Sequence, residues 1–340
     1  FNLPQLLTKL NKKNNPKIYG CEFNELNYFS SYSLNDRTRS FLKIQDGCNY
    51  PCTYCTIPIA RGLSRSDNIK NIIKNTNEIA SKGIKEIVLT GVNIGDFKDL
   101  KSGRGLSSLI TELERIQGIE RYRISSIEPN LITNEIIELV EKSNKFMPHF
   151  HIPLQSGSDL ILGKMKRRYQ TKLYKNKIKT IKDKIKNVCI GADVIVGFPG
   201  ETDEEFNKTF EFIKNLKISY LHVFSYSERE NTRAINFNQK VSKKDKKIRS
   251  KKLRILSNKL KESFYLKYIN TTQTVLFETK NDQNMLYGYT ENYIKVKIPF
   301  DSKICKTKQN VRLISLDSDG SINAQIISKK NRLCIQQSHI

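Results

Sequence analysis

The sequence predicts an α/β domain followed by a small all-β domain. Two observations indicate this organisation. Residues 41–226 alternate short apolar runs with stretches whose apolar residues recur at helical spacing, whereas residues 272–327 contain only short alternating runs separated by turn signals. Strands that alternate with helices require right-handed crossovers and therefore a parallel sheet, either open or curled into a partial barrel.

The α/β half contains strand and helix signals in regular alternation. Between the first two strands, Ile69, Ile72 and Ile79 recur at helical spacing. Thr202 and Glu205 predict a capping box at the start of the helix that follows the fifth strand. The six predicted strands are 41–45, 86–90, 121–125, 149–153, 192–197 and 220–226.

In the all-β half, short alternating runs predict four strands, at 274–278, 293–297, 310–315 and 321–326. Asn281-Asp282 and Asp319-Gly320 are turn signals between them. A barrel of this size fits a nucleic-acid-binding module or a structural cap. Residues 240–261, with 11 basic residues and one acid, predict a basic helix that links the halves, the alternative being a merely solvated linker.

The composition is strongly basic. A formal charge of +25 from 59 Lys and Arg residues favours a polyanionic partner, with nucleic acid first. However, 43 of these residues are Lys in a chain rich in Asn and Ile, and codon drift toward AT also produces that mixture.

No apolar run reaches the roughly 18 residues of a membrane span, and the start does not resemble a signal peptide. Free cysteines indicate a reducing compartment, so we expect a cytoplasmic protein without a membrane partner.

The spacing Cys48-x3-Cys52-x2-Cys55 lies directly after the first predicted strand. Three thiolates on one tight loop suit a [4Fe-4S] cluster that keeps one iron open, and S-adenosylmethionine chelates such an iron. Zinc is the main alternative, but a structural zinc site needs a fourth ligand, and no other Cys or His lies within about twenty residues. The remaining cysteines are expected to be inert small hydrophobes: Cys21, Cys189, Cys305 and Cys334.

Polar and glycine residues follow the other predicted strands. Because functional residues of such barrels gather at the carboxyl ends of the strands, we expect these residues to surround S-adenosylmethionine. His149 and His151 share one face of the fourth strand, where structural roles are expected. No catalytic residue is assigned. The candidate cofactor contacts are Thr90, Gly91, Asn93, Ser125, Ser126, Glu128, Gln155, Gly197, Pro199 and Gly200.

Several motifs resemble the methylthiotransferase branch of radical S-adenosylmethionine (SAM) enzymes. Asp46-Gly47 before the first cysteine and the short spacing of Arg61-Gly62-x-Ser64-Arg65-Ser66 are similar to the members that act on threonylcarbamoyladenosine in tRNA. Members that act on isopentenyladenosine or on a ribosomal protein usually have a longer spacing there. The other motifs are Ser125-Ser126-Ile127-Glu128-Pro129, His151-Ile152-Pro153-Leu154-Gln155-Ser156-Gly157-Ser158, Met165-Lys166-Arg167-Arg168-Tyr169 and Val196-Gly197-Phe198-Pro199-Gly200-Glu201-Thr202.

The resemblance implies a partial (β/α)6 radical-SAM barrel followed by a small all-β TRAM-like barrel that binds tRNA. It implies replacement of the C2 hydrogen of the modified adenine, next to the anticodon, by a methylthio group. One SAM donates the methyl group, another yields the 5′-deoxyadenosyl radical, and flavodoxin or ferredoxin supplies the electron. The implied divisions are a remnant at 1–36, a radical SAM core at 37–240, a basic helix at 241–270, a TRAM-like barrel at 271–330 and a tail at 331–340.

The sequence departs from the branch at its start. Members carry an N-terminal domain whose three cysteines hold a second [4Fe-4S] cluster, the site of the transferred sulfur. Here only residues 1–7 resemble the end of that domain, and Cys21 is a poor ligand candidate alone. The chain is therefore expected to be a fragment or the product of a gene that lost that half. A non-catalytic RNA-binding remnant and a methylthiotransferase for another target remain alternatives.

The cysteine loop generates the first prediction. Anaerobic reconstitution should give one cubane per chain, measured as four irons with a brown absorbance. Changing Cys48, Cys52 or Cys55 to Ala should abolish it, whereas Cys189→Ala and Cys305→Ala should retain it. Binding of a single zinc in place of iron would contradict the assignment.

Overall fold

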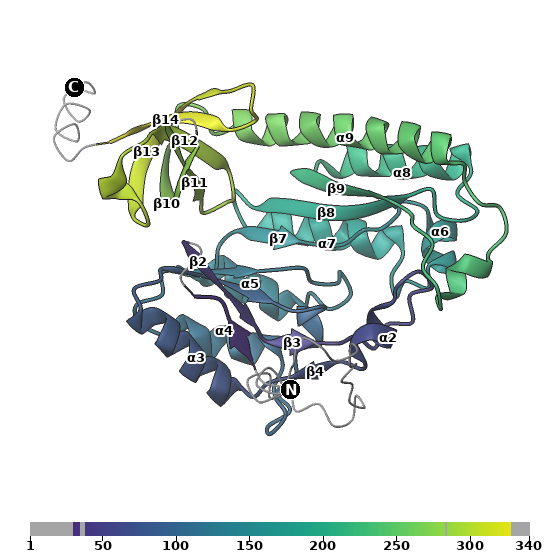
Figure 1. Ribbon diagram of the computed structural model, residues 1–340, viewed down its shortest axis with the longest axis horizontal. Coiled ribbons are helices and arrows are strands. Elements are labelled where there is room, and N and C mark those ends of the chain that lie inside the picture. The colour runs from purple at the N-terminus through teal and green to yellow at the C-terminus, as the bar shows by residue number, and fades with distance from the viewer. Residues whose placement is uncertain (1–29, 35–37, 283, 328–340) are drawn as a thin grey trace, which may run out of the picture.

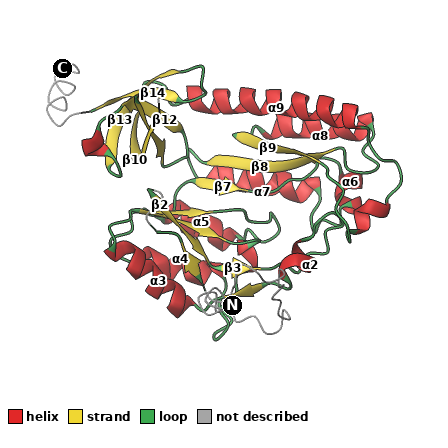
Figure 2. Cartoon of the chain, in the orientation of Figure 1, coloured by secondary structure: helices red, strands yellow, loops and turns green. Residues whose placement is uncertain are grey.

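A computed structural model describes residues 30–34, 38–282 and 284–327. Its larger part is a partial barrel of six parallel strands (Figures 1 and 2). β2, β5 and β6 form one sheet, which β1 (Ser31–Tyr32) extends antiparallel, and β7, β8 and β9 form another. A parallel bridge between Ser126 and His151 joins the two sheets. The six are β2 (Arg39–Lys43), β5 (Glu86–Thr90), β6 (Arg121–Ile124), β7 (His149–His151), β8 (Cys189–Val196) and β9 (Tyr220–Ser225). In the described part of the chain no pairing joins β9 to β2, so the barrel stays open on that side.

Helices connect successive strands and cover the outer face. In α3 the predicted spacing is confirmed, because Ile69, Ile72 and Ile79 are all buried, and Asn68 caps the helix by accepting from the Asn71 amide. These side chains join Leu42 and Leu89 in one continuous core. The connecting helices are α3 (Ile69–Ser81), α4 (Leu106–Glu114), α5 (Asn134–Lys142), α6 (Asp159–Lys164), α7 (Thr171–Lys184) and α8 (Asp203–Leu216).

Two local expectations need correction. The first strand ends at Lys43, and Gln45 belongs to a separate short strand, β3 (Gln45–Asp46), that pairs antiparallel with β4 (Arg65–Ser66). Thr202 does cap α8 by accepting from the Glu205 amide at 3.3 Å. The Glu205 carboxylate, however, accepts from the Ser158 hydroxyl, so only half of the predicted capping box forms.

The second part is a closed five-stranded barrel with strand order β10-β11-β12-β14-β13. The sequence predicted four of these strands and missed β11, where Gly288 at the centre lowers the strand propensity although Tyr287 and Tyr289 favour it. The predicted turn at Asn281-Asp282 is wrong, because both residues pair with β11 and the chain reverses after them. The turn at Asp319-Gly320 is confirmed. The strands are β10 (Thr272–Asp282), β11 (Met285–Thr290), β12 (Lys295–Pro299), β13 (Lys308–Leu316) and β14 (Ile322–Ile326).

A single helix, α9 (Lys243–Leu266), runs alongside both parts (Figure 1). Its first turns lie at the carboxyl ends of β8 and β9, where Lys246 donates to the Tyr226 carbonyl. Its last turns place Phe264 and Tyr265 in the core of the closed barrel. At 1.5 Å per residue the helix is about 36 Å long. It therefore connects the closed barrel to the opposite end of the strands.

None of the described helices has the length and apolar character needed to cross a membrane.

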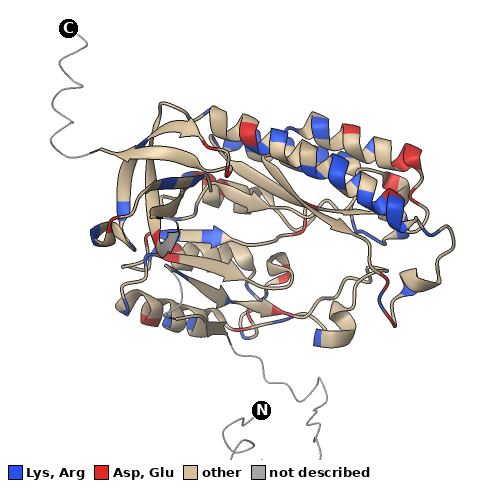
Figure 3. Cartoon of the chain, turned by 45° about the horizontal axis from the view of Figure 1, so that its top comes forward, with Lys and Arg blue, Asp and Glu red and all other residues tan. Residues whose placement is uncertain are grey.

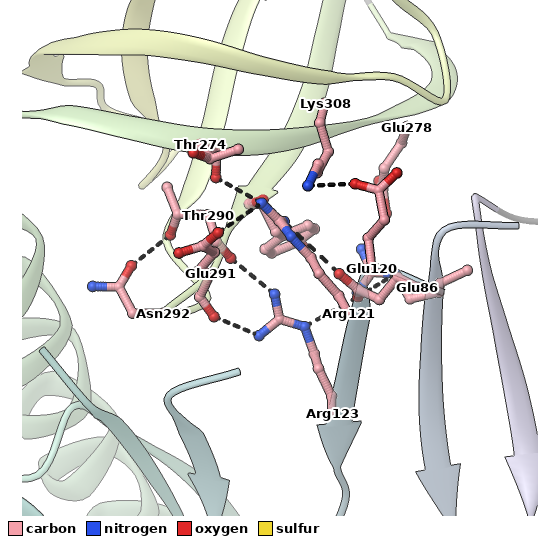
Figure 4. A network of polar contacts seen from close by, with 12 residues as sticks. Glu86, Glu120, Arg121, Arg123, Thr274, Glu278, Thr290, Glu291, Asn292 and Lys308 are labelled. Carbon is pink, nitrogen blue, oxygen red and sulfur yellow. Dashed lines mark hydrogen bonds and ion pairs between the residues drawn. The ribbon is translucent and has the colours of Figure 1, made fainter. Parts of the chain in front are cut away.

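A buried layer of charge joins the closed barrel to the amino ends of the parallel strands (Figure 4). Arg121 donates to the carbonyls of Thr274 and Tyr289, and Arg123 donates to those of Thr290 and Glu291. The carboxylate of Glu86 lies 3.0 Å from Arg123, 3.6 Å from Arg39 and 3.9 Å from Arg121. Burial alone would raise the pKa of Glu86, but the three guanidinium groups outweigh it and lower that pKa.

Removing the charge of Glu86 is predicted to destabilise the protein strongly. Glu86→Gln leaves three buried guanidinium groups without their common counter-ion, so the free energy of unfolding should fall by about 3–5 kcal/mol. Glu112→Gln is the matched control, because Glu112 pairs with Arg104 and Arg115 at the surface. Such exposed pairs contribute about 0–1 kcal/mol. Urea unfolding of both variants measures the difference, and equal losses would contradict the role of Glu86.

Candidate active site

Cys48, Cys52 and Cys55 lie half-buried in the loop between β3 and the short helix α2 (Ile57–Arg61). Thr53 fixes this loop. Its amide and hydroxyl donate to the carbonyls of Met165 and Lys164 at 3.1 and 2.9 Å, and its carbonyl accepts from the Ala234 amide. The loop is thus held between the end of α6 and the 3-10 turn η3 (Arg233–Asn236). Cys189 and Cys305 are free thiols elsewhere, and Cys189 is buried against the core of the closed barrel.

Gln45 connects this loop to the end of the neighbouring strand. Its fully buried amide nitrogen donates to the Gly47 carbonyl and the Ser64 hydroxyl, while its oxygen accepts from the Asn93 amide at 2.9 Å. A Cβ at Gly91 would lie 2.8 Å from that oxygen, so only glycine allows the approach. This bridging role of Gln45 was not predicted from the sequence. A polar residue at the end of an apolar run, directly before the cysteines, was the available signal.

The two segments that resemble the threonylcarbamoyladenosine enzymes contact each other. The Asp46 carboxylate lies 3.1 Å from both Arg61 and Arg65 and 3.5 Å from Lys43. Burial would raise the pKa of Asp46, but the Gly47 amide and these cations lower it. The ion pairs close the cysteine loop at its base.

Arg167 is a functional candidate that the sequence analysis quoted in a motif but did not single out. Its guanidinium donates to the Cys52 Sγ at 3.1 Å and forms an ion pair with Glu128. Burial raises the pKa of Cys48 to about 11 and also raises that of Cys52, which Arg167 opposes. Burial therefore favours the protonated thiols of Cys48 and Cys52, and a bound metal ion would supply the positive charge that stabilises thiolates.

Three predicted cofactor contacts have buried polar atoms that lack a hydrogen-bond partner in the described part of the chain. They are Asn93 Oδ1, Ser125 Oγ and Gln155 Oε1, which follow three successive strands, β5, β6 and β7. An unsatisfied buried acceptor costs about 1–3 kcal/mol, so a ligand that donates there gains affinity. The amino group and ribose hydroxyls of SAM are such donors. The residues present therefore fit the cofactor that the cysteine spacing predicts.

The other predicted contacts have no buried polar side-chain atom that lacks a partner in the described part of the chain. Thr90 and Ser126 are half-buried beside these residues, and Glu128 is committed to Arg167. A Cβ at Gly197 would lie 2.3 Å from Lys246 Cγ, so the close approach there is made by α9 of this chain. The amide of Gly200 donates to the Gln239 carbonyl, and Pro199 is buried next to it. A ligand role for Gly197, Pro199 and Gly200 stays a prediction.

The model of the radical SAM superfamily matches residues 42–213. The chain belongs to this superfamily. The matched region runs from β2 into α8, so it contains the cysteine loop and every candidate cofactor contact. When bound, the [4Fe-4S] cluster of a radical SAM enzyme supplies the electron that cleaves SAM. In this chain Cys48, Cys52 and Cys55 would hold the cluster, and Asn93, Ser125 and Gln155 would orient SAM beside it.

Curated relatives place the chain in the methylthiotransferase branch of the superfamily. A threonylcarbamoyladenosine tRNA methylthiotransferase MtaB of Bacillus subtilis is 42% identical over 269 residues, which cover 78% of this chain and 60% of that protein. Its namesake in Thermotoga maritima is 35% identical over 86% of this chain and 67% of that protein. A tRNA-2-methylthio-N(6)-dimethylallyladenosine synthase of Clostridium tetani is 40% identical over 75% of this chain and 57% of that protein. The chain thus spans about 57–67% of the length of these relatives.

Ser125 provides a test of the SAM site. Ser125→Ala removes an unpartnered hydroxyl, so the stability should be unchanged or slightly higher, while the affinity of the cluster-loaded chain for SAM should fall about 5- to 10-fold. Thr38→Val is the matched control, since Thr38 Oγ1 is also buried and unpartnered but lies at the amino end of β2. Equilibrium dialysis measures both affinities. An unchanged affinity in Ser125→Ala would exclude this hydroxyl from the site.

Proposed function

We propose that this chain is the radical-SAM and RNA-binding part of a tRNA methylthiotransferase that acts on C2 of threonylcarbamoyladenosine next to the anticodon. The observation that carries the proposal is the 42% identity to the Bacillus subtilis protein of that name over 78% of this chain. The contact of Asp46 with Arg61 and Arg65 supports the choice of target, because both segments resemble that group of enzymes.

A basic groove supports RNA as the substrate. It is a cavity of about 1020 Å³ between α9 and the residues that follow β9. Lys243, Lys247, Lys251 and Arg254 recur along one face of α9 and line it. Figure 3 shows Lys and Arg concentrated along this helix. Since α9 extends from the rim of the SAM site to the closed barrel, phosphates bound along it would lead a nucleotide of the same RNA toward the site.

The closed barrel contributes less free positive charge than its composition suggests. Lys297 pairs with Asp317 and Asp319, and Lys308 pairs with Glu120 of the α/β part. Two of its aromatic rings are also used within the chain. Tyr289 and Tyr293 stack on each other with ring centroids 4.9 Å apart, Arg39 lies over Tyr289, and His149 stacks on Tyr293. The RNA contact is therefore assigned to α9.

The alternatives predict different behaviour. A methylthiotransferase for a protein substrate does not require the basic face of α9, and an isopentenyladenosine enzyme requires a different nucleoside. A non-catalytic RNA-binding remnant would bind tRNA without cleaving SAM. A cytoplasmic location and flavodoxin or ferredoxin as the electron donor are further parts of the proposal.

Charge reversal on α9 tests the RNA contact. The full chain with Lys247→Glu, Lys251→Glu and Arg254→Glu should bind tRNA more weakly, and the slope of log affinity against log salt should be about 2–3 units less steep. The control carries Lys172→Glu, Lys175→Glu and Lys186→Glu, which change the net charge equally at other exposed positions. Filter binding at several salt concentrations measures the slopes. Equal slopes in the two variants would place the RNA elsewhere.

The target nucleoside is tested with tRNA that carries deuterium at C2 of the modified adenine. With the cluster reconstituted and a strong reductant, deuterium should appear in 5′-deoxyadenosine when the tRNA contains threonylcarbamoyladenosine. A tRNA with isopentenyladenosine should give little transfer. Equal transfer from both would contradict the assigned nucleoside. Cleavage of SAM without transfer from either would contradict a tRNA substrate, and no cleavage with an intact cluster would favour the non-catalytic remnant.

A further inference from the structure

Three of the four histidines of this chain lie on one face of the sheet β7-β8-β9. His149 and His151 alternate with Phe150 along β7, and Phe150 is fully buried in the core on the other face. His222 of β9 pairs in register with Asp193 of β8. This face is opposite the one that packs against α7 in the core, and it is turned toward the interior of the partial barrel.

Side chains from three strands converge there. His151 Nε2 lies 2.9 Å from Asp193 Oδ1, and His222 Nδ1 lies 3.5 Å from the same oxygen. One ligand atom from each residue falls within 4.8 Å of the other two. Ligand atoms of a tetrahedral zinc ion, at 2.0–2.1 Å from the metal, lie about 3.4 Å apart. The spacing is therefore already close to that of a metal site.

A neighbouring side chain orients one of the imidazoles. The Tyr220 hydroxyl lies 3.5 Å from His151 Nδ1 and 3.0 Å from His149 Nε2. A partner on Nδ1 leaves Nε2 of His151 directed at Asp193. Metal-binding histidines are usually held in this way, with the second ring nitrogen bonded to a polar group.

The charge of the cluster favours a cation. The Asp193 carboxylate lies between the two imidazoles, 2.9 Å from His151 Nε2 and 3.5 Å from His222 Nδ1. A carboxylate at the centre of the cluster repels phosphate or carboxylate ligands and attracts a metal ion. Two imidazole nitrogens with one carboxylate suit zinc and other transition metals, whereas calcium and magnesium prefer oxygen ligands.

The site is open to solvent on the side of His222. The His222 side chain is 57% exposed and that of Asp193 is 22% exposed. His222, but neither His151 nor Asp193, lines the cavity of about 300 Å³ next to Tyr289 and Tyr293. Three protein ligands beside an open space are the arrangement of catalytic zinc sites, which keep a fourth position for water or a substrate oxygen.

We propose that His151, Asp193 and His222 bind one divalent transition-metal ion of the zinc type, separate from the cluster at the cysteine loop. The ion has an open position on the exposed side of the site, next to His222, where it takes water or an oxygen donor of a ligand. The proposal does not depend on the identity of the RNA substrate, because it rests on the ligand geometry alone.

The test uses the full chain with its iron–sulfur cluster reconstituted, incubated with Zn²⁺ and desalted. Elemental analysis should give one zinc per chain in addition to the iron. Zinc-edge X-ray absorption should show only nitrogen and oxygen ligands, at about 2.0–2.1 Å and with two imidazoles. His222→Gln and Asp193→Asn should lose the zinc and keep the iron. Tyr220→Phe should weaken zinc binding about 10-fold.

His149→Gln is the matched control, since His149 lies on the same face but outside the ligand set, and it should retain the zinc. Because His222 is exposed, His222→Gln decides the matter if Asp193→Asn does not fold. The proposal is overturned if the wild-type chain binds no zinc, if the zinc has sulfur ligands, or if the zinc survives in His222→Gln. Any of these results would mean that His151, Asp193 and His222 form hydrogen bonds with one another and bind no metal ion.

Discussion

The carboxylate of Glu86 is buried at the amino end of β5, with three guanidinium groups around it. Arg121 and Arg123 use their remaining donors on backbone carbonyls of the closed barrel, so the counter-ion and the domain contact form one network. A buried charge network requires specific geometry, because each member loses its hydration on burial. This requirement fixes where the closed barrel sits on the strands, and α9, which joins both cores, maintains the same arrangement along the outside.

The two ends of the parallel strands therefore contact different parts of the chain. The amino ends are covered by the closed barrel, and the carboxyl ends carry the cysteine loop with Asn93, Ser125 and Gln155. The interior between them is polar on the side of β7-β8-β9, where His151, Asp193 and His222 meet. The candidate SAM contacts at the rim and these three side chains in the interior thus lie on or directly after strands of the same partial barrel.

Predictions that rest on a local signal agree with the structure. All six strands predicted from apolar runs are confirmed within three residues. The assignment of Cys48, Cys52 and Cys55 to a cluster, which rests on their spacing, stays a prediction. Predictions were wrong where a contact with a distant segment of the chain decides the local structure. Gln45 ends the run 41–45, but its amide binds two other segments, so it leaves the strand. Glu205 fits a capping box, but Ser158 from another element takes its carboxylate.

The sequence by itself determined the family, the cysteine loop and the order of strands and helices. Each of these depends on adjacent residues or on apolar residues that recur at a short spacing. Only the tertiary structure decided the partners of charged and polar side chains. Arg123 and Lys308 contributed equally to the net charge, yet both are used within the chain, whereas the lysines of α9 line an open groove. His151, Asp193 and His222 are separated by up to 71 positions, and only the parallel pairing of their three strands brings their ligand atoms together. The reason is physical: spacing along a strand fixes which face a side chain takes, but the distance between strands is set by the packing of the whole fold.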